Sequence, residues 1–184
     1  NNNRGLTALQ NVDQRVNSYR IDAVKGTART SMWKSSVPWI KDHWLIGSGL
    51  DTIKYMYPVY RRSEYGILEG GHNFTPDRLH NEYLNTLATR GVLGFLIYYG
   101  WFIGGWLVIV VMGFHRMKSS PERYFIAGLT TGALVYLGQV LFNFGVVATL
   151  VLFYILMGLA VAIIERYKND QRLALLKAEK ESIS

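Results

Sequence analysis

Charged residues are segregated along this 184-residue chain, and that pattern constrains its fold more than any other feature. Asp, Glu, Lys and Arg are absent from residues 91–114 and again from residues 124–164. The average composition hides the segregation, since 49% hydrophobic and 18% charged residues would suit a soluble domain. Soluble helices keep charged side chains on their exposed faces, so two runs of this kind predict an integral membrane protein.

The lengths of the uncharged runs predict three membrane spans. As a single helix, the run 124–164 would be about 60 Å long, twice the hydrocarbon core of about 30 Å. It must therefore hold two spans, and Asn143–Gly145 is the polar, flexible break near its middle. We predict an all-α integral membrane helical bundle with three transmembrane helices, at about residues 92–112, 124–142 and 147–164.

Basic residues beside the spans predict their orientation. The loop from His115 to Arg123 and the tail after Ile164 are both rich in Lys and Arg, which places both in the cytoplasm by the positive-inside rule. The chain then divides into a large extracytoplasmic loop with short helices (1–90), the transmembrane helices (91–166) and a cytoplasmic tail (167–184). The loop carries 12 Lys and Arg against 8 Asp and Glu, but long loops cross largely regardless of charge.

Two short helices are predicted in the loop. One begins after Thr27, carries Arg29 and Trp33 on one face and is interrupted by Pro38. The other takes Thr75 as its N-cap and Pro76 as its first residue. It would run through His80 to Gly91, which ends it or bends it into the first span. In that span, Gly100, Gly104 and Gly105 are expected to permit close helix packing.

His80 and Arg29 are the residues best suited to chemistry. The imidazole has an ordinary pKa of about 6.5, so it could accept a proton from a hydroxyl, with Asp77 one turn away to orient it. The guanidinium of Arg29 could hold phosphate oxygens through two parallel hydrogen bonds. The alternatives are a hydrogen-bonded interfacial histidine and a solvated arginine. Further candidates for an anionic ligand are Arg20, Arg61, Arg62, Arg78 and Arg90.

Several kinds of chemistry find no support in the residues. The chain has no Cys, and His72 and His80 are not spaced as a helical metal pair, so no metal site is predicted. There is no phosphate-binding Gly-Lys-Thr loop and no dinucleotide fingerprint, so no nucleotide cofactor is expected. The net charge of +7 is spread over three polar segments without a nucleic-acid-binding motif, so no nucleic acid partner is expected.

Four short stretches together resemble a known family. They are Thr27–Trp33, in which three residues separate Arg29 from Trp33, then Ile46–Gly49, His80–Leu84 and Gly91–Gly94. Over about residues 20–165 the sequence resembles the C-terminal region of the O-antigen ligase and polymerase superfamily of bacterial membrane glycosyltransferases.

The resemblance implies a reaction at the outer face of the bacterial cytoplasmic membrane. A glycan would pass from an undecaprenyl diphosphate carrier to an acceptor hydroxyl, with inversion at the anomeric carbon and with neither a metal nor another cofactor. His80 would take the acceptor proton and Arg29 would hold the diphosphate. The partners would be the lipid-linked donor, a glycan, lipid or protein acceptor, and membrane lipids. The remaining substrate-binding candidates are Arg20, Trp33, Arg78, Asn81 and Arg90.

Some alternatives stay open. The motifs do not separate a ligase from a polymerase or from a protein O-oligosaccharyltransferase. A transporter or export subunit for an anionic lipid or polysaccharide would use the same arginines and leave His80 dispensable. Members of the family have more spans than this chain, so we expect it to be part of a longer protein and to lack activity alone.

Overall fold

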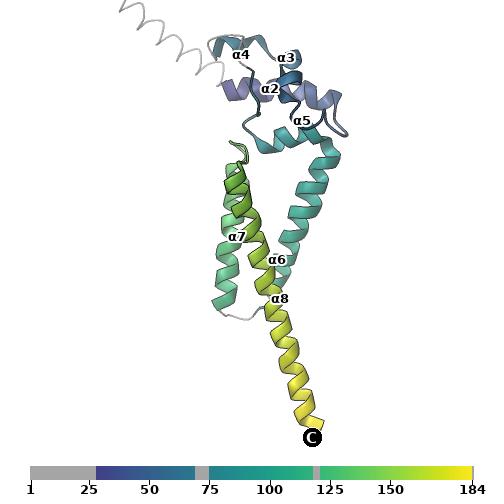
Figure 1. The fold of residues 1–184 in the computed structure, drawn as a ribbon, viewed down its shortest axis with the longest axis vertical. Helices are drawn as coiled ribbons and strands as arrows, with labels where there is room; N and C mark the ends of the chain where they lie inside the picture. The colour runs from purple at the N-terminus through teal and green to yellow at the C-terminus, as the bar shows by residue number, and fades with distance from the viewer. Residues whose placement is uncertain (1–27, 69–74, 118–120, 184) are drawn as a thin grey trace, which may run out of the picture. The chain divides into compact units, whose positions relative to one another are not determined.

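A computed structural model describes residues 28–68, 75–117 and 121–183, and these residues form helices and connections without a strand (Figure 1). The all-α prediction is confirmed for this part of the chain. The described residues fall into two compact units. The N-terminal unit runs to Leu79 and also includes Leu84–Val92, and the bundle unit comprises His80–Tyr83 and the residues from Leu93 onward.

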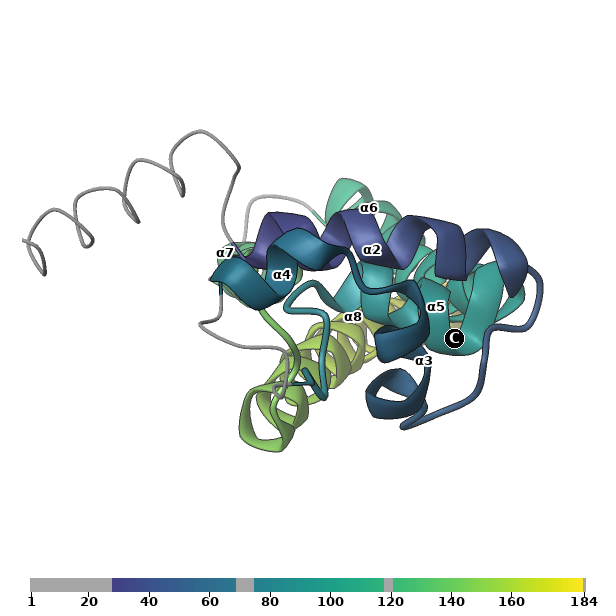
Figure 2. The same ribbon diagram turned by 90° about the horizontal axis from the view of Figure 1, so that it is seen from above.

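The N-terminal unit is built on helix α2 (Ala28–Asp42), against which α3 (Ile53–Tyr60) and α4 (Ser63–Leu68) pack (Figure 2). Three aromatic side chains, Trp39, Tyr57 and Tyr65, are fully buried in its core, whereas Tyr55 is exposed. The Tyr57 and Tyr65 rings meet edge to face with centroids 5.4 Å apart. The fully or almost fully buried core residues are Met32, Trp39, Ile53, Tyr57, Tyr65, Leu79 and Ala88.

The predicted interruption at Pro38 is wrong, because α2 continues through it to Asp42. Proline in a helix removes one backbone hydrogen bond and costs about 3 kcal/mol. Two features offset that cost: Pro38 lies on the exposed side of the helix, and Trp39, the next residue, is fully buried in the core. Burying a tryptophan contributes a free energy of similar size.

Two glycines allow the segment after α2, residues 44–49, to lie against residues 88–92 of the same unit. Gly47 and Gly91 have φ values of +71° and +65°, and a Cβ on either would collide with backbone atoms of the other segment. Backbone hydrogen bonds join the same segments: Ser48 N to Ala88 O at 3.0 Å, Gly49 N to Thr89 O at 2.9 Å and Val92 N to Trp44 O at 2.7 Å. The segments 44–49 and 88–92 therefore form one tightly joined backbone contact.

Helix α5 (Glu82–Phe95) begins later than predicted, so the expected N-cap at Thr75 is wrong. Residues 75–81 are not helical. Thr-Pro-Asp is also a turn sequence, and Asn81 offers a second good capping residue just before Glu82. The prediction for Gly91 is confirmed, because its backbone is not helical and divides α5 before the apolar run begins.

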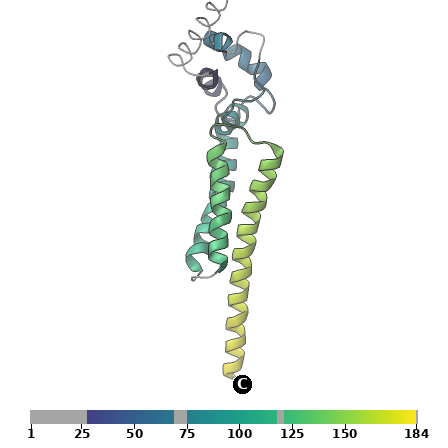
Figure 3. The same ribbon diagram turned by 90° about the vertical axis from the view of Figure 1, so that its left-hand side faces the viewer.

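The bundle unit contains α6 (Gly104–Arg116), α7 (Pro121–Gln139) and α8 (Val147–Ile183), which pack against one another. The π-helical stretch η1 (Leu96–Ile103) leads into α6. The predicted break at Asn143–Gly145 is confirmed, since α7 ends before it and α8 begins just after it. Figure 1 and Figure 3 show α7 beside α8, and α8 continuing past the N-terminal start of α7.

A glycine other than the predicted ones permits the close helix packing. A Cβ on Gly113 of α6 would collide with the Ile164 side chain of α8. By contrast, a Cβ on Gly100 or Gly104 would meet only atoms of nearby turns, and one on Gly105 would meet nothing within 4 Å. The role predicted for these three glycines is therefore wrong within the described residues. Trp106 adds a second tie between α6 and α8, since its Nε1 donates to Met157 O at 3.1 Å.

Two helices of the described chain are long and apolar enough to cross a membrane: Glu82–Arg116, which joins α5, η1 and α6, and Val147–Ile183, which is α8. Only 17% and 22% of their most apolar stretches are buried, whereas a core helix of a soluble protein would be mostly buried. Helix α7 carries Glu122 and Arg123 in its first turn and ends at Gln139, so it is less apolar along its length. Two of the three predicted spans are thus supported by helix length and composition.

Candidate functional site

His80 lies in the connection directly before α5, in a backbone conformation that few residues adopt. Its φ is +50°, in the left-handed region, where histidine is more frequent than most residues other than glycine. The expectation that His80 sits one turn into a helix is therefore wrong. Such conformations cost about 1–3 kcal/mol and persist where the surroundings hold them, often at functional sites.

The imidazole of His80 contacts a ring from a distant part of the chain. The Phe144 ring meets it edge to face, with centroids 5.2 Å apart and an interplanar angle of 66°. The Nδ1 atom is buried, and no hydrogen-bond partner for it exists among residues 28–68, 75–117 and 121–183. The predicted helical spacing of Asp77 from His80 is wrong, because residues 75–81 are not helical, and the Asp77 side chain is exposed.

The two residues after Asn81 bind the end of α7 and the connection to α8. Glu82 N donates to Val140 O at 2.9 Å, and the Tyr83 hydroxyl donates to Leu137 O, also at 2.9 Å. In the opposite direction, Gly145 N donates to Glu82 Oε2 at 3.4 Å. Neither Glu82 nor Phe144 was predicted as part of the site. No sequence pattern indicated these contacts, because the segments lie more than fifty residues apart.

Arg29 and Trp33 lie four residues apart on α2, as predicted. Arg29 occupies the first turn and its side chain is exposed, whereas Trp33 is half-buried. The Trp33 indole Nε1 donates to Leu79 O at 2.8 Å. This bond ties α2 to the residue immediately before His80 in the chain.

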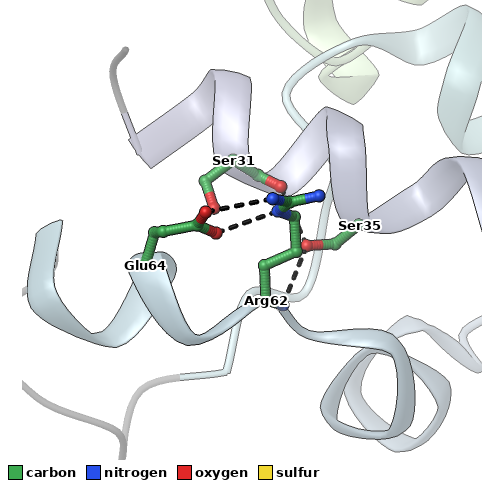
Figure 4. Close-up of polar contacts among 4 residues, drawn as sticks. All are labelled: Ser31, Ser35, Arg62 and Glu64. Atoms are coloured by element: carbon green, nitrogen blue, oxygen red, sulfur yellow. Dashed lines mark hydrogen bonds and ion pairs between the residues drawn. The ribbon is translucent and has the colours of Figure 1, made fainter. Parts of the chain in front are cut away.

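Arg62 and Glu64 form an ion pair between the connection before α4 and the first turn of α4, and the backbone of Arg62 also binds α2 (Figure 4). The guanidinium Nε and Nη2 donate to the two carboxylate oxygens at 2.9 and 3.0 Å, and Arg62 N donates to Ser35 Oγ at 3.2 Å. The hydrogen bonds from Arg62 lower the pKa of the Glu64 carboxyl to about 2. Arg62, which the sequence offered as a candidate for binding an anionic ligand, therefore binds Glu64 and Ser35 of its own unit.

The remaining predicted site residues belong to two units or lie outside the described residues. Arg78 and Asn81 are half-buried, and Arg90 is exposed directly before the break at Gly91. Arg20 lies outside the described residues. Arg29, Trp33, Arg78 and Arg90 belong to the N-terminal unit, whereas His80 and Asn81 belong to the bundle unit. A shared site for Arg29 and His80 remains a prediction.

Two cavities of the bundle unit are formed by other residues. An apolar one of about 570 Å³ lies between the η1–α6 stretch and α8, and includes Trp101, Gly105 and Tyr154 in its wall. One of about 420 Å³ lies between α7 and α8 and includes Glu122 and Arg166. Neither cavity is lined by a predicted site residue. Among the described residues there is no group of three or more His, Asp or Glu side chains arranged to hold a metal ion.

Comparison with known proteins gives one match. A family model described as O-antigen ligase matches residues 3–99, a stretch that includes α2, the Gly47 turn and the His80–Tyr83 segment. No curated protein and no solved structure matches the chain significantly. Because the family model covers more than half of the sequence, the chain belongs to the O-antigen ligase family.

Proposed function

We propose that this chain is the C-terminal part of a bacterial membrane glycosyltransferase that moves a glycan from undecaprenyl diphosphate to an acceptor hydroxyl. Family membership implies O-antigen ligase- or polymerase-like activity and, in general, lipid-linked glycan substrates. The two long apolar helices and the membrane ligase family both indicate a membrane location. One observation supports a specific catalytic residue. His80 has a left-handed backbone conformation and lies inside the stretch matched to the family.

The proposal includes three spans and a defined orientation. Helix α7 would be the third span, supported by the uncharged run from residue 124 to residue 164. The N-terminal unit would lie outside the cytoplasmic membrane, and the charged end of α8 would lie in the cytoplasm with the basic residues around Arg116 and Arg123. The site would then face the carrier lipids of the outer leaflet.

The proposed reaction is a displacement at the anomeric carbon of the glycan. The acceptor hydroxyl oxygen bonds to that carbon as the bond from the carbon to the diphosphate oxygen breaks. His80 takes the hydroxyl proton, and the bonding electrons leave with undecaprenyl diphosphate. Arg29 stabilises the negative charge that develops on the leaving diphosphate. Attack from the face opposite the diphosphate inverts the anomeric configuration.

The other candidate residues are assigned to binding. Arg20, Arg78 and Arg90 would contact the anionic part of the donor, and Asn81 would position the loop beside His80. Trp33 would present its ring face to a sugar while its indole N–H stays bonded to Leu79 O.

The test is transfer by the full-length protein in proteoliposomes that contain an undecaprenyl-diphosphate-linked glycan. We expect His80→Ala to reduce the rate by a factor of about 10² or more, because a general base contributes 10² to 10⁴. His115→Ala, at an exposed histidine at the far end of α6, is the matched control and should retain activity. Near-normal transfer by His80→Ala would contradict the catalytic assignment, whereas absence of transfer by the wild-type protein would favour a transporter that only binds the anionic lipid.

A second variant series tests Arg29. Arg29→Ala removes the charge and Arg29→Lys keeps it but loses the paired hydrogen bonds, so activity should fall in the order wild type, Lys, Ala. Equal rates for all three proteins would remove Arg29 from the site. Offering glycan, lipid and protein acceptors in the same assay distinguishes a ligase from a polymerase and from a protein O-oligosaccharyltransferase.

A further inference from the structure

The segment from Leu137 to Gly145 contacts the His80–Tyr83 segment at four points, although it lies beyond the residues matched to the family. Three are the hydrogen bonds of Glu82 and Tyr83, and the fourth is the Phe144 ring against the imidazole. All of these residues belong to the bundle unit, so the contacts form within one compact body.

Glu82 fixes both ends of the connection between α7 and α8. Its backbone N–H binds Val140 at the start of the connection, and its carboxylate binds the backbone N–H of Gly145 near the end. Asn143 fixes the interior, since its Oδ1 accepts from Phe144 N at 3.0 Å. Together these bonds set where the Phe144 side chain leaves the backbone.

The imidazole of His80 depends on this arrangement because it lacks a polar anchor at Nδ1. Histidines that act as bases are usually oriented by a hydrogen bond at the second ring nitrogen. In the described chain, Nδ1 of His80 is buried without one. An aromatic ring packed edge to face restricts rotation of the imidazole instead.

We propose that Phe144 is a positioning residue that orients the imidazole of His80, and that Glu82 holds the Phe144 connection in place. The inference rests on the proposed function, in which His80 is the base. It extends the site to the α7–α8 connection. Misplacing a reacting group by about 1 Å can lower a rate by as much as 10²-fold, so loss of the ring should reduce turnover without removing donor binding.

The experiment uses the full-length protein in lipid nanodiscs. We expect Phe144→Leu to lower kcat by roughly tenfold with little change in the KM for the donor, and Phe144→Tyr, which keeps the ring, to restore the rate. Phe142→Leu is the matched control, because this exposed phenylalanine lies in the same connection. Glu82→Ala should resemble Phe144→Leu, whereas Glu82→Gln, which keeps an acceptor oxygen, should lie near wild type.

A spectroscopic measurement separates positioning from a general structural effect. With isotope-labelled histidine, the NMR signal of His80 is identified as the one that His80→Ala removes. Phe144→Leu should move that signal, because the ring current of Phe144 is lost, and Phe142→Leu should not. An unmoved signal, or a wild-type kcat for Phe144→Leu, would overturn the inference.

The two proposals fail in different ways. If His80→Ala remains active, the assignment of His80 as the base is wrong, whatever Phe144 does. If His80→Ala is inactive and Phe144→Leu has normal turnover, the base assignment stands and the positioning role is wrong.

Discussion

At the scale of single residues, the glycines of the family-like motifs have a backbone role rather than a chemical one. Gly47 and Gly91 both adopt positive φ, and each leaves room for the backbone of the other segment. Gly91 is also the point at which α5 is broken before the apolar run. These motif glycines therefore reflect how the segments 44–49 and 88–92 are joined.

Replacing either glycine should destabilise the N-terminal unit. Gly47→Ala and Gly91→Ala place a Cβ in a left-handed conformation, which alone costs about 1–2 kcal/mol, and the collision with backbone adds to it. The measurement is the thermal unfolding midpoint of the purified full-length protein.

Gly128→Ala is the control for those variants. It lies in α7, where a Cβ meets nothing within 4 Å, and alanine is the better helix former. Its midpoint should stay the same or rise. An equal fall for all three variants would mean that the backbone contact between 44–49 and 88–92 contributes nothing particular to stability.

At the scale of elements, α2 is held by backbone groups of segments that are far from it in the sequence. The bond from Arg62 N to Ser35 Oγ fastens the connection before α4 to α2, the helix that carries Arg29 and Trp33, and the Arg62–Glu64 pair joins that connection to the first turn of α4. The pair is partly exposed, so its contribution to stability is small and falls with salt concentration.

This pair should make the N-terminal unit sensitive to acid. The pKa of Glu64 is lowered from 4.5 to about 2 by Arg62, so the folded state is favoured when the carboxyl is ionised. The stabilisation is present above pH 4.5 and is lost as the pH falls toward 2. Unfolding midpoints measured between pH 5 and pH 3 should fall less steeply for Glu64→Gln and for Arg62→Ala than for wild type. An unchanged slope would assign the acid sensitivity to other carboxylates.

Helix boundaries show what the sequence could and could not predict. The break at Asn143–Gly145 and the kink at Gly91 were predictable because nothing competes with a local signal in an apolar run. Pro38 misled because tertiary packing decides that boundary, since Trp39 is buried beyond the proline. Thr75 misled because a second local signal competes with it, since Asn81 directly precedes the helix start that is used. The contact between Phe144 and His80 could not be predicted from the sequence, because no local pattern connects residues 80 and 144.

At the scale of the whole molecule, the uneven charge distribution predicted the helical membrane class, and the long, poorly buried apolar helices agree with it.

The orientation of the chain in the membrane is the remaining prediction for the whole molecule. The chain has no Cys, so single cysteines can be introduced as labels. We expect an impermeant thiol reagent to modify Tyr55→Cys in intact cells, and Leu175→Cys only after permeabilisation. Both side chains are exposed, so access to the reagent depends on the membrane face.

The reverse labelling pattern would place the N-terminal unit in the cytoplasm and would remove the basis for a reaction with outer-leaflet carriers. Labelling of both positions in intact cells would mean that an even number of spans separates them, so that α7 does not cross the membrane.

The contacts of residues 137–145 have a practical consequence for anyone designing expression boundaries or a mutational library. A gene fragment trimmed to the part that the family model recognises, residues 3–99, would still encode the histidine but none of the rings and carbonyls that α7 and its following connection supply. An inactive product of that kind would say nothing about the chemistry. A library that stops at residue 99 would leave Phe144, whose ring contacts the imidazole, unsampled.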